Sequence, residues 1–258
     1  MQRTVSTIDI SKIPSSIAVL VGEARVYNSS CSETAQTFFI EGKDRFYLKM
    51  HRKGALLREY QMTCFLNRHG LAPHPIVYEA ESNNDYLLTE ALPGEDGISG
   101  GHLEEPRKLA AVFGESLREL HSLSGEGCPC NNRTAEMLKE IDDKMASGPG
   151  DTAILAEGKL RAFKKMSEMK HIALDDTVLH GDYCLPNIIM ENYRLSGFVD
   201  LGYGGIGDRH HDIFWGIWTL NYNLRTNSYR DIFLDAYGRS DLDPDRLELY
   251  RLIAGLTG

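Results

Sequence analysis

Three polar residues around one expected β-hairpin constrain this chain more than any other feature. Asp182 and Asn187 precede one short apolar run, and Asp200 follows the next apolar run. Residues 191–194 between the runs are polar and turn-like, so residues 188–199 are predicted to form a β-hairpin. A lone Asp or Asn beside an apolar run is ordinarily a turn residue or a cap. The joint occurrence of all three around one hairpin favours a functional site instead.

The expected register of the hairpin brings two oxygen ligands together. If the chain turns about Tyr193 and Arg194, Asn187 pairs with Asp200. Directly opposed residues in an antiparallel pair have Cβ atoms ~4.5–5.5 Å apart on one face. An amide oxygen and a carboxylate at that separation can share a hard cation such as Mg²⁺. Asp182, in the preceding loop, is then within reach of a phosphate carried by that metal.

The spacing of these residues matches the chemistry of phosphoryl transfer. His180, Asp182 and Asn187 follow the pattern H-x-D-x-x-x-x-N, in which the Asp accepts the proton of the acceptor hydroxyl and the Asn binds Mg²⁺. Asp200 begins Asp-Leu-Gly, where this chemistry uses D-F-G. The pattern assigns Asp182 as catalytic base and Asn187 and Asp200 as metal ligands. His180 is expected to form structural hydrogen bonds, and Asp212 is expected to be a buried brace or cap.

A lysine and a glutamate upstream complete the expected phosphate site. Lys49 lies near the end of a predicted strand, and Glu59 follows ten residues later on a predicted helix. An exposed lysine on a strand is the commoner case. Because a carboxylate on an otherwise apolar helix face needs a partner when buried, we expect Glu59 to pair with Lys49 and the pair to hold nucleotide phosphates.

The order of expected elements predicts an α+β chain with two lobes. Residues 1–91 are rich in strands, with strand runs at 36–40, 45–50, 76–79 and 85–90 and one helix at 55–69. Residues 92–97 are rich in Pro and Gly and form the predicted linker. Residues 98–258 are mainly helical, with helices at 105–122, 134–146, 156–169, 208–220 and 245–256, and carry the catalytic hairpin. The linker is where a ligand cleft is expected.

The composition of the chain limits which kinds of partner the protein is expected to bind. The formal net charge of −9 argues against general binding of nucleic acid and permits attraction of a cationic substrate. No long apolar run suggests a membrane span, and the five cysteines show no disulfide-framework spacing. These features predict a cytoplasmic protein without membrane association.

The segment Gly202-Tyr203-Gly204-Gly205-Ile206-Gly207 matches the dinucleotide-binding pattern G-x-G-x-x-G. The match follows a hairpin rather than the first strand of a βαβ unit, and residues 222–228 contain none of the acidic residues that would bind a ribose. We interpret these glycines as a flexible loop after Asp200.

The chain resembles the aminoglycoside phosphotransferases, whose motifs it carries in the same order along the sequence, and most closely those that act at the 3′-hydroxyl. The resemblance rests on the segments Phe46 to Met50, Leu88 to Ala91, Leu120 to Ser122, Cys128-Pro129, His180 to Asn187 and Ser196 to Gly202. It implies a protein-kinase-like fold, a β-rich nucleotide-binding lobe and a helical catalytic lobe. It also implies ATP or GTP and Mg²⁺ as cofactors, an aminoglycoside as substrate, and a monomer or a homodimer.

By position, the resemblance assigns further nucleotide contacts. Tyr47 would stack on adenine, Glu90 and Ala91 would present backbone to the edge of the base, and Lys49 with Glu59 would hold the phosphates. The chain departs from the usual family pattern at Tyr203, where an arginine is common, and in its last five residues, which carry neither an acid nor an aromatic. Kinases of other small hydroxyl compounds (macrolides, choline-like amines, sugars) stay open as alternatives, as does an idle nucleotide-binding regulator.

Overall fold

The computed structural model describes residues 3–30, 34–147 and 153–257. The chain forms two compact units, which are described separately. The first unit contains residues 1–105 and 185–203, and the second contains residues 106–184 and 204–258. The hairpin after Asp182 therefore groups with the first unit, although the chain enters it from the second. The lobe boundaries predicted from the sequence stay a prediction.

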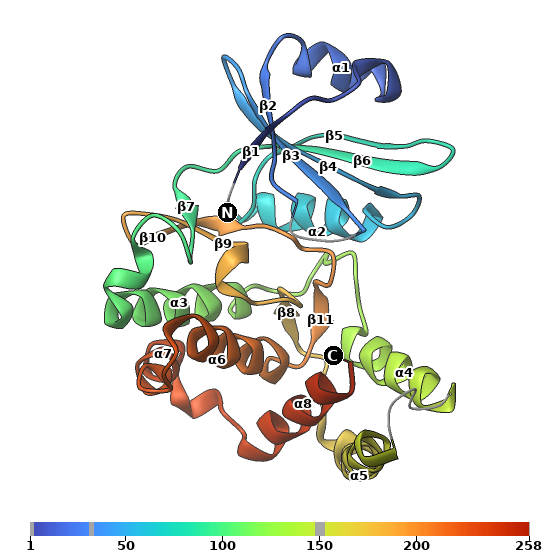
Figure 1. The fold of residues 1–258 in the computed structure, drawn as a ribbon. Helices are drawn as coiled ribbons and strands as arrows, with labels where there is room; N and C mark the ends of the chain where they lie inside the picture. The colour runs from blue at the N-terminus through green and yellow to red at the C-terminus, as the bar shows by residue number, and fades with distance from the viewer. Residues whose placement is uncertain (1–2, 31–33, 148–152, 258) are drawn as a thin grey trace. The chain divides into compact units, whose positions relative to one another are not determined.

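A six-stranded antiparallel sheet forms most of the first unit (Figure 1). Its order is β1-β2-β3-β4-β6-β5, with strands β1 (Thr4–Ser6), β2 (Arg25–Asn28), β3 (Gln36–Glu41), β4 (Arg45–Arg52), β5 (Pro75–Ala80) and β6 (Asn84–Glu90). The unit also contains the helices α1 (Ser15–Val21) and α2 (Leu57–Asn67). The predicted strands and helix are confirmed. β1, β2 and α1 were not predicted.

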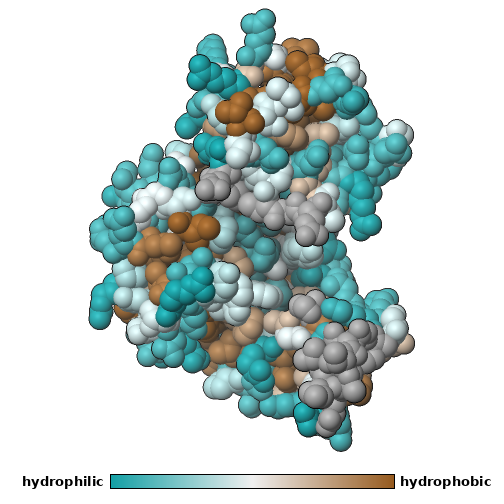
Figure 2. All heavy atoms as spheres, viewed as in Figure 1, coloured by the Kyte–Doolittle hydropathy of each residue, from teal (hydrophilic) through white to brown (hydrophobic). Residues whose placement is uncertain are grey.

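Strand alternation gives this sheet two different faces. Phe38, Leu48 and Leu88 are direct register partners and pack against Ile17 of α1 in one buried hydrophobic cluster. Because successive side chains point to opposite faces, the residues between them lie on the other face, which carries polar and aromatic groups. Figure 2 shows hydrophobic residues gathered over α1, where Val19 is 82% exposed.

The predicted hairpin is present, but its predicted register is wrong. Strands β9 (Ile188–Glu191) and β10 (Arg194–Phe198) pair with each other, and β7 (Glu95–Asp96) adds a third strand. The turn lies at Asn192 and Tyr193, whose φ angles of 52° and 58° suit a tight hairpin turn. A β-bulge between Leu195 and Gly197 then moves the pairing back by one residue.

As a result, Asn187 lies opposite Val199 rather than Asp200. The Val199 N–H donates to the Asn187 carbonyl at 3.0 Å. The turn position and the bulge together account for the error, because the earlier turn shifts the partner of Asn187 by two residues and the bulge restores one of them.

The second unit is mainly helical. It contains α3 (Pro106–His121), α4 (Arg133–Ala146), α5 (Ala153–Met169), α6 (His210–Leu224), α7 (Arg230–Tyr237) and α8 (Pro244–Thr257), with a two-stranded sheet of β8 (Thr177–Leu179) and β11 (Gly205–Gly207). The predicted helices are confirmed, and α7 was missed. The interpretation of the glycine segment as a loop is wrong for residues 205–207, since they form β11. No helix among the described residues is long and apolar enough to span a bilayer.

Two packing regions stabilise this unit. Met137, Ile141, Met166 and Tyr250 bring α4, α5 and α8 into one buried cluster. On the other side, α3 packs closely on α7 at Gly114.

Candidate active site

One large cavity lies within the first unit, on the sheet face opposite α1. Its volume is about 810 Å³. Two rows of register partners cross its floor. The first row is Thr37, Lys49 and Leu87, and the second is Phe39, Tyr47 and Thr89. We call this space the sheet cavity. It lies beside the predicted linker, because residues 92 and 94–96 also line it.

Lys49 forms a charged cluster in the sheet cavity. Its Nζ donates to Glu59 Oε2 at 2.7 Å, as expected from the sequence, and to Asp200 Oδ1 at 2.5 Å. The side chains of Lys49 and Glu59 are 18% and 10% exposed, whereas that of Asp200 is 52% exposed. One lysine therefore joins a buried carboxylate on α2 to an accessible carboxylate after β10.

The pKa values of the cluster follow from this arrangement. Burial lowers the pKa of Lys49, but the charges of Glu59 and Asp200 outweigh burial and raise it overall, so Lys49 stays protonated. Burial raises the pKa of Glu59, and Lys49 offsets part of that rise. Lys49 therefore keeps its positive charge at neutral pH, while the accessible end of the cluster is the Asp200 carboxylate.

The two expected metal ligands also line the sheet cavity. Asn187 is 6% exposed and Asp200 is accessible, and both side chains end in oxygen atoms. Asp200 has a φ of 63°, a left-handed conformation that Asp tolerates better than most residues. Asp200 contacts Lys49 through Oδ1. An amide and a carboxylate oxygen suit Mg²⁺, which usually completes its coordination with phosphates and water.

Aromatic rings and one arginine form another wall of the sheet cavity. Phe39 and Tyr47 have ring centroids 5.1 Å apart. Arg3, just before β1, places its guanidinium carbon 3.7 Å from the Phe39 centroid and donates from Nη2 to the Tyr47 hydroxyl at 2.7 Å. Arg3 thus fixes the outer edge of the Tyr47 ring. No sequence pattern indicated this role, because the edge strand that follows Arg3 is only three residues long.

The backbone N–H groups at Glu90 and Ala91 are already used. The Glu90 N–H donates to the His74 carbonyl and the Ala91 N–H donates to the Arg45 carbonyl, both at 2.9 Å. These residues line the sheet cavity, but neither backbone N–H is available to donate to the edge of a nucleotide base. The next backbone N–H along the chain is that of Leu92, which also lines the cavity.

In the second unit, Asp212 at the start of α6 holds the segment that carries Asp182. Asp212 is fully buried, and its carboxylate accepts the backbone N–H of His180 at 2.6 Å and of Gly181 at 2.9 Å. His211 Nε2 lies 2.9 Å from the Gly181 carbonyl. Gly181 has a φ of 84°, which favours glycine over any residue with a side chain. The expectation that Asp212 is a buried brace is confirmed.

Further contacts fix the residues beside Asp182. His180 is buried, and its Nδ1 accepts the Asp182 N–H at 3.3 Å, which agrees with its expected structural role. The Tyr183 hydroxyl donates to the Phe113 carbonyl at 2.7 Å, and the two rings stack with centroids 4.4 Å apart. Side-chain hydrogen bonds join the Cys184 thiol to Asp182 and to Thr219 of α6.

Buried histidines surround the brace. His121 contacts Asp212 through Nε2 at 3.3 Å and the Tyr237 hydroxyl through Nδ1 at 2.9 Å. Burial lowers the pKa of both His121 and His211, so both are neutral near pH 7. Burial alone would raise the pKa of Asp212, but the hydrogen bond from His121 and the nearby histidines hold it below its usual value. Asp212 therefore stays ionised and accepts strong hydrogen bonds from the loop.

The structure thus gathers seven of the eight predicted site residues around one cavity. Lys49, Glu59, Tyr47, Glu90, Ala91, Asn187 and Asp200 line the sheet cavity in the first unit. Asp182 belongs to the second unit, and the chain passes from one unit to the other between Cys184 and Leu185. Arg3, Thr37 and Leu92 line the cavity and were missed from the sequence. Thr37 could have been found from strand pairing, because it is the register partner of Lys49.

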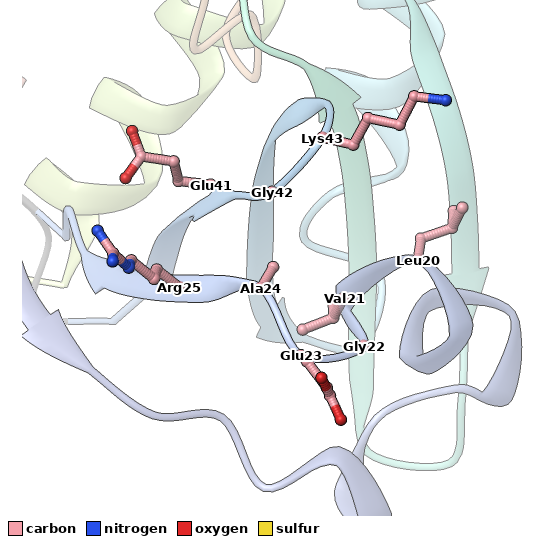
Figure 3. Close-up of a pocket in the computed structure, with 9 residues that line it drawn as sticks. All are labelled: Leu20, Val21, Gly22, Glu23, Ala24, Arg25, Glu41, Gly42 and Lys43. Carbon is pink, nitrogen blue, oxygen red and sulfur yellow. The ribbon is translucent and has the colours of Figure 1, made fainter.

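A second cavity of about 590 Å³ lies between the end of α1 and the β3–β4 turn (Figure 3). It is lined by residues 20–25 and 41–43. Its charged side chains, Glu23, Arg25, Glu41 and Lys43, point apart from one another. Convergent polar groups mark a ligand site, and their divergence here favours the sheet cavity.

The known proteins that this chain matches in sequence are phosphotransferases. A profile of the phosphotransferase enzyme family matches residues 31–250. A probable aminoglycoside 3′-phosphotransferase of Lactococcus lactis subsp. lactis (strain IL1403) is 38% identical over 246 residues, covering 94% of each chain. An aminoglycoside 3′-phosphotransferase of Niallia circulans is 37% identical and covers 70% of this chain and 71% of its own.

Solved structures share the fold. The crystal structure of an aminoglycoside-3′-phosphotransferase of type VIII has a TM-score of 0.77 at 23% identity and covers 93% of this chain and 97% of its own. An aminoglycoside phosphotransferase of Streptomyces rimosus, solved with ADP and streptomycin, has a TM-score of 0.73 at 22% identity and covers 98% and 100%. These similarities establish the predicted α+β, kinase-like fold.

Proposed function

We propose, from the premise that the chain belongs to the aminoglycoside phosphotransferase family, that it transfers the terminal phosphoryl group of ATP to a hydroxyl of an aminoglycoside. The observation that carries the nucleotide half is the cluster of Lys49 with Glu59 and Asp200 in the sheet cavity. A protonated lysine held by two carboxylates, one of them accessible, matches the phosphate and metal site of phosphoryl-transfer enzymes.

In this proposal the row of Phe39, Tyr47 and Thr89 binds the base, and the row that contains Lys49 binds the phosphates. Tyr47 offers its ring to adenine, while Glu90 and Ala91 contribute contacts other than their backbone N–H groups. Leu92 is the nearest residue with a backbone N–H to offer the base edge. Lys49, kept in place by Glu59, contacts the phosphate oxygens.

Asn187 and Asp200 fit a Mg²⁺ ion through their oxygen atoms and the open lining of the sheet cavity. When bound, the ion would neutralise charge on the phosphate oxygens. The charge on Lys49 adds to this effect without any change of protonation.

Asp182 supplies the acceptor half of the proposed mechanism. Its carboxylate would orient the acceptor hydroxyl and take its proton as the new oxygen–phosphorus bond forms and the bond between the γ-phosphorus and the departing ADP oxygen breaks. Because Asp212 fixes the backbone of His180 and Gly181, Asp182 starts from a defined position. Catalysis then consists mainly of positioning and charge stabilisation.

The names of the relatives support an aminoglycoside 3′-hydroxyl as the acceptor. We further propose that residues 1–91 and 98–258 act as nucleotide and substrate lobes joined by residues 92–97.

A transfer assay with purified protein, labelled ATP and Mg²⁺ tests the proposal. We expect phosphate transfer to kanamycin-type or neomycin-type drugs, a product that NMR shows to be phosphorylated at the 3′-position, and no reaction with a matched drug that lacks this hydroxyl.

Asp182→Asn should lower kcat by about 10²–10⁴-fold, whereas the exposed control Asp142→Asn should leave kcat unchanged. Transfer to a macrolide, a choline-like amine or a sugar but not to any aminoglycoside would replace the substrate. Nucleotide binding without transfer to any hydroxyl compound would favour an idle regulator.

A further inference from the structure

The half-buried thiol of Cys184 lies two positions after Asp182, and no step of the proposed mechanism uses it. The backbone N–H of Cys184 donates to the Asp182 carbonyl at 2.8 Å, so the backbone makes a three-residue turn at this point. The turn brings the two side chains together, and the Cys184 thiol hydrogen-bonds the Asp182 carboxylate. The thiol is therefore a direct neighbour of the proposed catalytic base.

A second hydrogen bond joins the same thiol to Thr219 on α6. Thr219 is 1% exposed, and its hydroxyl oxygen accepts a hydrogen bond from Nδ2 of Asn223, one helical turn further on, at 3.1 Å. Nδ2 of Asn223 also donates to the Thr219 carbonyl at 2.8 Å. The side chains of Asn223, Thr219 and Cys184 thus form a continuous series of hydrogen bonds that ends at Asp182. We call these three residues the thiol bridge.

The direction of each bond follows from the hydrogen atoms that each group carries. An ionised carboxylate can only accept, so the single S–H of Cys184 donates to Asp182. The sulfur then acts as an acceptor, and the one O–H of Thr219 donates to it. Nδ2 of Asn223 donates to Thr219 in turn. Every bond of the thiol bridge therefore donates toward the carboxylate of Asp182.

The Cys184 thiol stays protonated at neutral pH. Burial and the nearby charge of Asp182 raise the pKa of Cys184 well above its ordinary value, because both disfavour the thiolate. A nucleophilic cysteine has the opposite property, a lowered pKa. The S–H is therefore suited to a role as a hydrogen-bond donor and not to one as a nucleophile.

The backbone on both sides of the thiol bridge is firmly packed. A Cβ added to Gly216, three positions before Thr219 on α6, would lie 3.3 Å from the Tyr183 ring. The Tyr183 hydroxyl donates to the Phe113 carbonyl at 2.7 Å. These contacts fix the main chain around Asp182 but do not set the torsion angles of its side chain. The thiol bridge is the contact that acts on the carboxylate itself.

We propose that Cys184 is a positioning residue for phosphoryl transfer, whose S–H, held by Thr219, sets the orientation in which the Asp182 carboxylate meets the acceptor hydroxyl. No bond to sulfur forms or breaks in this role. A displacement of about 1 Å at a reacting group can lower a rate by roughly 10²-fold, so one weak hydrogen bond can control turnover without adding to substrate binding. The inference rests on the proposed function, because it takes Asp182 as the group that accepts the proton.

Steady-state kinetics should separate positioning from binding. Cys184→Ala removes the donor and should lower kcat by about 5–20-fold, somewhat less than for a stronger donor to a charged group. The KM for the aminoglycoside and the KM for ATP should each stay within about twofold, because the lost contact acts on the transition state and not on binding. Cys184→Ser supplies an O–H in place of the S–H and should recover kcat to within about threefold of the wild type. Thr219→Val keeps the shape but removes the O–H, and should lower kcat with both KM values retained.

Cys64 provides a matched control. It is also half-buried, and its thiol hydrogen-bonds the side chain of Tyr60 on α2. Cys64→Ala makes the same chemical change away from the Asp182 segment and should leave kcat unchanged. Urea unfolding of each variant shows which of them are folded, so that a lower kcat is measured only on native protein.

Infrared spectroscopy observes the thiol directly, without any turnover. The S–H stretching band that is missing from the spectrum of Cys184→Ala identifies the Cys184 thiol. We expect Asp182→Ala to move this band to higher wavenumber, because the S–H bond is weakened while it donates to a carboxylate and strengthens when that acceptor is removed. A thiol that only fills space would keep its band in place.

The possible outcomes separate the inference from the proposed function. If the wild-type protein phosphorylates an aminoglycoside but Cys184→Ala keeps the wild-type kcat, the positioning role is wrong and the function stands. A lower kcat that Cys184→Ser does not recover would assign Cys184 to packing and overturn the positioning role, as would a KM that changes as much as kcat. If the wild-type protein transfers phosphate to no hydroxyl compound, the proposed function fails. In that case an S–H band that moves in Asp182→Ala still supports the thiol bridge, and an unmoved band overturns it.

Discussion

The carboxylate of Asp212 accepts the backbone N–H of Gly181 at 2.9 Å, across 31 positions of sequence. The same carboxylate accepts the His180 N–H, and both bonds end on a fully buried group. The segment before Asp182 is thus attached to the start of α6 rather than being a free loop.

Asp212→Asn should therefore lower both stability and turnover. The amide keeps one acceptor oxygen but loses the charge, and hydrogen bonds to charged groups contribute about 1.5–3 kcal/mol each. We expect the free energy of unfolding to fall by about 2–4 kcal/mol in urea titrations, and kcat to fall with nucleotide affinity retained. Asp142→Asn, on the exposed side of α4, should change neither. An unchanged kcat in folded Asp212→Asn would contradict the bracing role.

Lys49 and Glu59 should be coupled energetically. Lys49→Met leaves a buried carboxylate without its partner, and we expect a loss of about 1–3 kcal/mol, less than for a fully buried pair because Lys49 is partly exposed. Adding Glu59→Gln should recover part of that loss, because the uncompensated charge is gone. A double-mutant cycle in urea measures the coupling. Strict additivity would show that the two residues act independently. Lys139→Met, at an exposed pair with Asp143, serves as the control.

Stability should fall as the pH drops below the ordinary histidine range. Burial lowers the folded-state pKa of His121 and His211 from 6.5, so the unfolded chain binds protons more readily. Their contribution is fully present above pH 6.5 and is lost as the pH falls through the lower folded-state values. Thermal unfolding between pH 7.5 and 5.5 should show a decreasing Tm, with a smaller slope in His121→Gln. His74→Gln, at an exposed site, should keep the wild-type slope; an equal slope in all three would exclude His121 as a cause.

Two glycine substitutions should have opposite effects. A Cβ at Gly114 would meet the Phe233 carbonyl and lie 2.9 Å from the Ala236 Cβ, so Gly114→Ala must separate α3 from α7. We expect a loss of about 1–3 kcal/mol for such overpacking. Gly158, in α5, has no neighbouring atom within 4 Å, so Gly158→Ala should stabilise the helix by about 0.5–1 kcal/mol. Urea unfolding of both variants checks the pair, and a stable Gly114→Ala would show that the helices can separate freely.

Arg3→Ala should weaken nucleotide binding modestly. The guanidinium packs on Phe39 and fixes the Tyr47 hydroxyl at the edge of the sheet cavity. An exposed cation–π contact contributes about 0.5–1 kcal/mol, so we expect the Kd for ATP to rise by roughly 2–5-fold in calorimetry. Arg25→Ala, at the second cavity, is the matched control. A lower Kd in Arg3→Ala would mean that Arg3 competes with the nucleotide instead of supporting it.

Local patterns in the sequence were sufficient for most of the secondary structure. Alternation and helical periodicity predicted β3, β4, α2 and the long helices, because these signals depend only on neighbours within one element. Short elements such as β1 and α7 escaped, since a few residues carry too little periodicity. The hairpin was predicted, but its register depended on a turn at Asn192 and Tyr193 and on a bulge, which a count of residues does not reveal.

For the functional site too, the sequence determined one part and the tertiary structure another. The sequence alone determined the chemical groups, because Asp182, Asn187 and Asp200 recur at a spacing that phosphoryl transfer requires, and it also indicated that Glu59 would pair with Lys49. Only the tertiary structure showed that Lys49 also contacts Asp200, 151 positions away, that the N–H groups of Glu90 and Ala91 are already bonded, and that Arg3 contacts Tyr47. Spacing along the chain fixes which groups are available. Packing and strand register decide which of them meet, because those contacts join residues that the sequence keeps far apart.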